Sequence, residues 1–144
     1  MNKKIYIGLN ITLLLWFALD MVGLSINGEV LVSRAYKDDW IFFLIYLLVF
    51  SFFLIQPKKG FYPLAIWLLM WFVSQFFSHW VFTITASGEE KMEYFSDTIK
   101  LFGATGYYIP DLYHIVLHIL ILSCFIGLII YKVEERNRSN KIAK

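Results

Sequence analysis

Four long apolar segments separated by short charged blocks constrain the fold of this chain more than any other feature. They cover about residues 5–26, 40–55, 61–85 and 110–131. A helix of roughly 20 residues crosses the hydrocarbon core of a bilayer. Backbone groups within lipid must be hydrogen-bonded inside their own segment, which a helix achieves. We therefore predict an all-α integral membrane four-helix bundle that forms a single membrane domain over residues 1–144.

The composition agrees with a membrane protein and excludes several other classes. Hydrophobic residues make up 59% of the chain and the mean hydropathy is +0.63. A net charge of +2 is too small to indicate a nucleic-acid partner. The lone cysteine, Cys124, cannot form an intrachain disulfide. The first apolar segment contains Asp20 and is long for a signal peptide, so we expect an uncleaved first helix.

Basic residues in the short connections predict the orientation, because they favour the cytoplasmic side. Four basic residues, in the first and third connections, fall on one side of the expected membrane. The other nine fall on the opposite side: Lys3, Lys4, Lys58, Lys59, Lys132, Arg136, Arg138, Lys141 and Lys144. We therefore expect a multi-pass protein of the cell membrane with both termini, including the charged tail 132–144, in the cytoplasm.

The longest connection lies between the third and fourth spans, on the predicted outer side. Within residues 89–102, the apolar residues Met92, Phe95, Ile99 and Phe102 recur at spacings of three and four. Charged residues occupy much of the opposite side of the same stretch. This pattern predicts an amphipathic helix that lies at the membrane interface. Such a helix either packs across the end of the bundle or covers it as a mobile element.

Five ionisable residues fall within or at the ends of the predicted spans: Asp20, His79, Asp111, His114 and His118. Ionisable groups at such depths are costly and are candidates for function. At 1.5 Å per residue, all five fall in the outer half of the bilayer. The second span supplies no ionisable group and is expected to complete the wall. We therefore predict a polar pocket that opens outward.

The three histidines suggest a metal site. His114 and His118 are four residues apart, so their side chains share one face of a helix. With His79 they would supply the three protein ligands of a catalytic zinc ion, with one position left for water. Asp20 or Asp111 would then orient a ligand or act as the catalytic base. We therefore predict metal ligation by His79, His114 and His118, and catalytic roles for Asp20 and Asp111.

Each of these residues also has an interpretation without catalysis. Asp111 follows Pro110 at the start of a helix, where the macrodipole alone favours an acid. Asp20 would lie at the membrane interface if the first helix were shifted by one turn. A neutral buried histidine can simply hydrogen-bond to a neighbouring helix. These alternatives remain open at the level of the sequence.

The set of Asp20, His79 and the His114-x-x-x-His118 motif is similar in kind to the zinc site of the membrane hydrolases that include alkaline ceramidases and adiponectin-type receptors. That resemblance implies zinc-dependent hydrolysis of a lipid. The family places a serine four residues before its histidine, where this chain has Gln75. The family's aspartate also follows that histidine, and its fold has seven helices. The resemblance therefore extends to residue types on three helices only.

Three classes of function follow from these observations. The first is a metal-dependent hydrolase or transferase that acts on a membrane lipid or lipid-linked substrate. The second is a b-type haem protein with His79 and His118 as axial ligands. The third is a non-catalytic accessory, immunity or assembly subunit that contacts other membrane subunits or a second copy of itself. A proton-coupled carrier would need to dimerise to form a path, and no glycine-interrupted span indicates a transport site.

Overall fold

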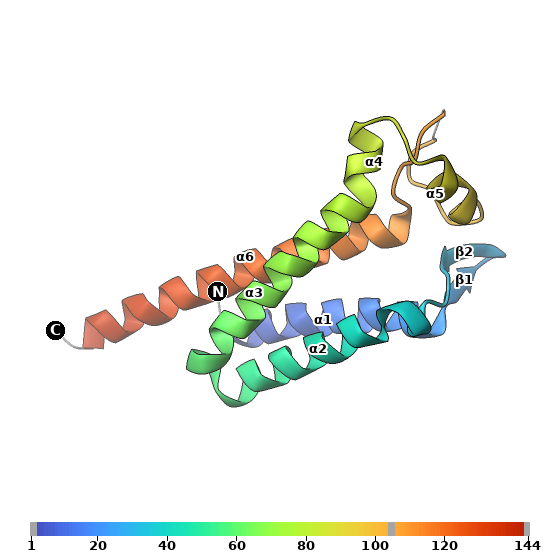
Figure 1. The fold of residues 1–144 in the computed structure, drawn as a ribbon. Coiled ribbons are helices and arrows are strands. Elements are labelled where there is room, and N and C mark those ends of the chain that lie inside the picture. The colour runs from blue at the N-terminus through green and yellow to red at the C-terminus, as the bar shows by residue number, and fades with distance from the viewer. Residues whose placement is uncertain (1–2, 104–105, 143–144) are drawn as a thin grey trace.

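The computed structural model describes residues 3–103 and 106–142, and its elements are mostly helical (Figure 1). In chain order they are α1 (Lys3–Val22), β1 (Leu24–Ile26), β2 (Glu29–Val32), α2 (Tyr36–Ile55), α3 (Pro57–Gln75), the π-helix η1 (Phe76–Trp80), α4 (Val81–Ile84), α5 (Glu89–Tyr94) and α6 (Leu112–Ile142).

The long helices form a four-membered bundle, as predicted. In the described part of the chain, four helical stretches are long and apolar enough to span a membrane: Lys3–Val22, Tyr36–Ile55, Pro57–Ile84 and Leu112–Lys141. Helix α1 packs against α2 and α6, and α3 packs against the same two helices, so the four close into a ring. Their outward faces carry exposed apolar side chains such as Leu15, Leu48 and Ile66, which suits contact with lipid.

The helix ends differ from the predicted spans for identifiable reasons. The first helix ends at Val22 because Gly23 adopts a positive φ of 75°. The second begins at Tyr36, one turn before the apolar run. The fourth continues through the charged tail to Ile142, where hydropathy gives no signal but charged residues still favour a helix. An ion pair of 3.0 Å between Lys132 and Glu135 supports this extension.

A short β-hairpin, absent from the predicted elements, follows α1. Its strands β1 and β2 pair antiparallel around Asn27 and Gly28, whose φ angles are 53° and 89°. Asn-Gly is the preferred pair for a two-residue hairpin turn with both φ angles positive. Thr98 forms a parallel bridge with Val30, and the amide of Leu112 donates to the carbonyl of Ile99. The hairpin is thereby tied to the start of α6.

The amphipathic segment is helical only at its beginning. Helix α5 covers Glu89–Tyr94, and the chain then turns so that the stretch around Thr98 can pair with the hairpin. The backbone hydrogen bonds to Val30 require an extended chain there, which ends the helix. The apolar residue Phe95 still faces inward, where it packs against His114 with ring centroids 5.2 Å apart.

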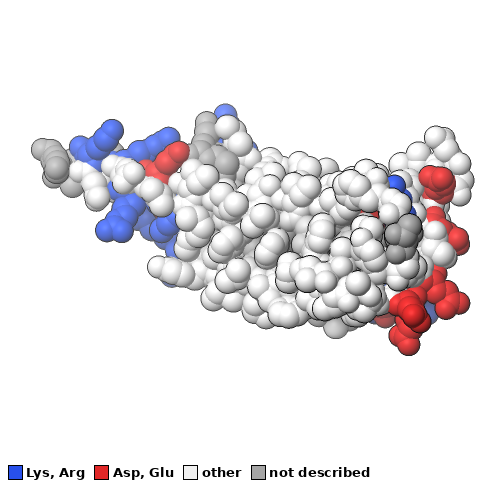
Figure 2. Space-filling model, turned by 90° about the horizontal axis from the view of Figure 1, so that it is seen from above, with Lys and Arg blue, Asp and Glu red and all other residues white. Residues whose placement is uncertain are grey.

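Charged residues gather at the two ends of the molecule, with an uncharged surface between them (Figure 2). Lysine and arginine dominate the end formed by the start of α1, the end of α6 and the connection between α2 and α3. Aspartate and glutamate dominate the end formed by the hairpin and α5. The uncharged zone is the surface that would face hydrocarbon.

Helices α2 and α3 approach each other closely at Gly60. A methyl group added there would lie 2.5 Å from the Cα atom of Phe53, which is closer than two carbon atoms can pack. We expect Gly60→Ala to destabilise the protein by about 1–3 kcal/mol, because the two backbones must move apart. Thermal unfolding in detergent measures this loss. The matched control is Gly8→Ala on α1, where nothing lies within 4 Å and the change should be neutral or slightly stabilising.

Candidate functional site

A polar cavity of about 250 Å³ lies at the acidic end of the bundle. It is bounded by the end of α1, the start of α2, the π-helix η1, helix α5 and the start of α6. Its polar lining residues are Asp20, Ser33, Asp38, Asp39, Gln75, Ser78, His79, Lys91, Thr98, Asp111 and His114. Four of the five ionisable residues singled out in the sequence therefore meet in one cavity.

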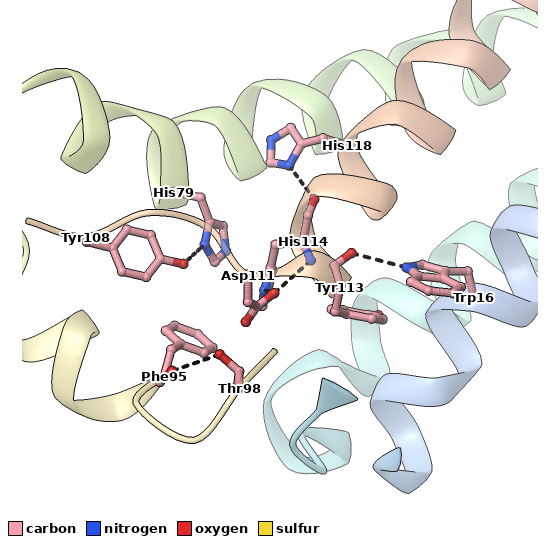
Figure 3. Close-up of polar contacts among 9 residues, drawn as sticks. All are labelled: Trp16, His79, Phe95, Thr98, Tyr108, Asp111, Tyr113, His114 and His118. Carbon is pink, nitrogen blue, oxygen red and sulfur yellow. Dashed lines mark hydrogen bonds and ion pairs between the residues drawn. The ribbon is translucent and has the colours of Figure 1, made fainter. Parts of the chain in front are cut away.

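Asp111 and His114 form a hydrogen-bonded pair at the start of α6 (Figure 3). Asp111 directly precedes the helix and is 1% exposed. Its Oδ1 accepts from the backbone N–H of His114 at 2.9 Å, which is the bond of a helix N-cap. The same oxygen lies 2.7 Å from Nδ1 of the His114 ring. Asp111 therefore caps the start of α6 and also contacts the His114 ring, and its catalytic role stays a prediction.

The electrostatic surroundings keep Asp111 in its carboxylate form. Burial alone would raise its pKa, but the hydrogen bonds to His114 and the charge of Lys100 outweigh burial and hold the pKa below its usual value. A carboxylate can only accept, so His114 carries its proton on Nδ1. The Nε2 atom of His114 is then free to take up a proton, as in hydrolases that use an aspartate–histidine pair.

His79 lies beside this pair and is held by a tyrosine. Its Nδ1 and the hydroxyl of Tyr108 are hydrogen-bonded at 2.6 Å. The ring centroids of His79 and His114 are 4.0 Å apart and their planes are 31° from parallel. His79 belongs to the π-helix η1, whose wider turn changes the direction of its side chain. Such irregular turns occur frequently at functional sites.

His118 lies against the other two histidines but does not line the polar cavity. Its ring centroid is 6.3 Å from that of His79, and its Nδ1 donates to the backbone carbonyl of His114 at 3.0 Å. Its side chain faces a separate apolar pocket between α3 and α6. No three His, Cys, Asp or Glu side chains of the described residues are placed to hold a metal ion. Zinc ligation by the three histidines stays a prediction and requires their rings to turn.

Carboxyl groups from the first two helices form the opposite wall. Asp20, on the last turn of α1, is 7% exposed and interacts directly with Asp39, with Asp38 close by. The predicted second span, residues 40–55, contains no ionisable group and leaves out Asp38 and Asp39. Because α2 begins at Tyr36, both lie in its first turn and reach the cavity.

Two lysines and two aromatic rings lie beside the histidines. The Nζ atoms of Lys91 and Lys100 each lie 5.7 Å from the ring centroid of Tyr108, and Lys100 also lies 5.7 Å from that of Phe95. Burial lowers the pKa of both lysines. Burial and the negative charge of Asp111 raise the pKa of Tyr108, so its phenol remains protonated. The sequence carries no spacing signal for Lys91 or Tyr108, because Lys91 comes from the short helix α5 and Tyr108 from an irregular segment.

No protein family, curated protein or solved structure matches this chain.

Proposed function

We propose that this membrane protein is an enzyme, a hydrolase or transferase, which carries out general acid–base chemistry on the polar part of a lipid or lipid-linked substrate. One observation carries the proposal: the buried carboxylate of Asp111 holds Nδ1 of His114, a residue that lines a cavity at the acidic end of the bundle. A positioned base of this kind typically contributes 10²–10⁴-fold to a rate.

The proposed reaction begins at Nε2 of His114. This nitrogen takes a proton from water, or from an acceptor hydroxyl group, as the oxygen attacks the acyl carbonyl of the substrate. The bond between the acyl carbon and the leaving group then breaks, and the same nitrogen returns the proton to the departing oxygen of an ester or nitrogen of an amide. His79 lies against the ring of His114 and is held by Tyr108, and its role is to orient the reacting group.

The lining of the cavity favours a substrate whose polar part carries no net negative charge. Four aspartates line the cavity against one lysine, Lys91. Asp20 and Asp39 interact directly and so share one proton, which still leaves more carboxylates than lysines to repel an anionic group. We therefore propose neutral or zwitterionic lipids as the substrate class.

The direct test incubates the purified protein, reconstituted in vesicles, with neutral and zwitterionic lipids that contain ester and amide bonds. Mass spectrometry follows product formation by the wild type and by His114→Gln. Dialysis against a chelator and metal analysis of the same preparation decide whether a metal takes part, and an absorption spectrum detects haem. No turnover of any lipid class by the wild type would reject the enzyme and favour a non-catalytic subunit.

We also propose that the acidic end of the molecule faces outward, with both termini in the cytoplasm of the cell. The separation of basic and acidic residues between the two ends supports this orientation (Figure 2). Ser96 and Ser139 are exposed at opposite ends, and the native Cys124 is buried. In intact cells, a membrane-impermeant maleimide is expected to label Ser96→Cys and not Ser139→Cys. The reverse pattern would invert the proposed orientation.

A further inference from the structure

An apolar pocket of about 250 Å³ opens between α3 and α6, beside the π-helix. It is lined by Phe72, Phe76, Trp80, His118, Ile119 and Leu122. All six belong to helical stretches long and apolar enough to span a membrane. The pocket therefore lies within the hydrocarbon layer, on the side of the histidines away from the polar cavity.

His118 is the polar exception in this lining, and one of its ring nitrogens has no partner. The residue is 5% exposed, and the rings of Phe72 and Trp80 pack edge-on against it. A carbonyl oxygen can only accept, so the bond to the carbonyl of His114 places the ring proton on Nδ1. In the neutral ring Nε2 is then an acceptor. Among the described residues it finds no hydrogen-bond donor, because the backbone group of Gln75 that lies close by is a carbonyl, which can only accept.

A buried acceptor without a donor is costly, which indicates that something outside the chain supplies the donor. We propose that this pocket binds the acyl chain of a membrane lipid, and that a hydroxyl or amide N–H group of that lipid donates to Nε2 of His118. The proposal rests on the proposed function, since it identifies the lipid as the substrate of the same site. It narrows the substrate class to acylated lipids with a hydrogen-bond donor near the chain.

The position of His118 connects the pocket to the cavity. Its ring contacts that of His79, which in turn lies against His114 (Figure 3). A lipid whose chain fills the pocket would thus bring its polar group to the histidines from the side, directly out of the membrane. This route needs no passage through water.

The lining also argues against a helix of another protein as the occupant. Helices that pack within membranes use small residues so that their backbones can approach closely. Here the lining is bulky throughout, with two phenylalanines and a tryptophan around one recess. Such a recess suits a flexible chain.

The experiment uses the full-length protein in phosphatidylcholine vesicles and two photoreactive probes. One is a diacylglycerol with a diazirine in its acyl chain, and the other is the same lipid with its hydroxyl methylated. We expect the hydroxyl probe to label peptides from residues 72–80 or 119–122 roughly three- to tenfold more than the methylated probe, which is the effect of one hydrogen bond. His118→Phe should abolish that difference.

Leu122→Trp should lower labelling by both probes, because the larger side chain fills the pocket. Leu122 is 40% exposed and so tolerates the change. Leu48→Trp, on the outward face of α2, is the matched control and should label like the wild type. Equal labelling by both probes in the wild type would overturn the role of His118. Absence of labelling at α3 and α6, or a crosslink between two protein copies in its place, would overturn the pocket as a lipid site.

This binding does not depend on catalysis, so His114→Gln should be labelled as strongly as the wild type. Labelling without turnover would reject the enzymatic function and support the lipid site. Turnover without labelling in this pocket would support the enzymatic function and reject the pocket as a lipid site.

Discussion

Replacing His114 by glutamine is expected to lower lipid turnover by roughly 10²–10⁴-fold, the contribution typical of a positioned general base. Glutamine has a similar reach, and its amide N–H can still donate to Asp111. It cannot accept and return a proton. The effect should therefore fall on kcat, with little change in KM, because the cavity and the lipid pocket keep their shape.

Initial rates in lipid vesicles measure this effect, and size-exclusion profiles of both proteins check that the variant is folded. The matched control is Thr12→Val, which changes an exposed residue of α1 that does not line the cavity. Turnover by His114→Gln within a few-fold of the wild type would contradict the assignment of His114 as the base.

The helical architecture followed from the sequence because a bilayer allows few alternatives. An apolar run of about 20 residues has to form a helix there. The hairpin had no clear signal in the sequence because β1 has only three residues. Its Leu24 and Ile26 also continue the apolar run of the first helix, so the run showed no break. The Asn27–Gly28 pair was the signal that could have revealed it.

The candidate site was predictable only in part. The spacing of Asp111, His114 and His118 placed them together on one helix, and the structure brings Asp111 and His114 into contact. The partition of His114 and His118 between two pockets was not predictable from their shared helix face, nor was the π-helix that carries His79. Nothing in the composition of Phe76–Trp80 distinguishes that turn from an ordinary one.

The segment that covers the cavity shows a second limit of sequence patterns. Apolar spacing over residues 89–102 indicated one continuous helix. The chain becomes extended near Thr98, where pairing with β2 satisfies its backbone groups. A contact between residues this far apart in sequence overrides the local helical pattern. The same long-range pairing positions the start of α6 and, with it, Asp111.

Two substitutions separate the helix cap that Asp111 forms from the catalytic role proposed for it. In Asp111→Asn, the new side chain would still accept from the backbone N–H of His114, because asparagine caps helices as well as aspartate does. It would lack the negative charge that stabilises a protonated His114. We therefore expect Asp111→Asn to lower kcat by up to about 10⁴-fold, as expected when an aspartate–histidine pair loses its charge, while thermal stability stays close to that of the wild type.

Asp111→Ala removes the cap as well as the charge. It is expected to lose about 0.5–2 kcal/mol of stability in addition to the loss of turnover, since the N–H of His114 loses its acceptor. Unfolding in detergent and initial rates in vesicles measure the two effects independently. If Asp111→Asn kept wild-type turnover and only Asp111→Ala lost it, Asp111 would be a helix cap alone, because turnover would then follow the start of α6 and not the charge beside His114.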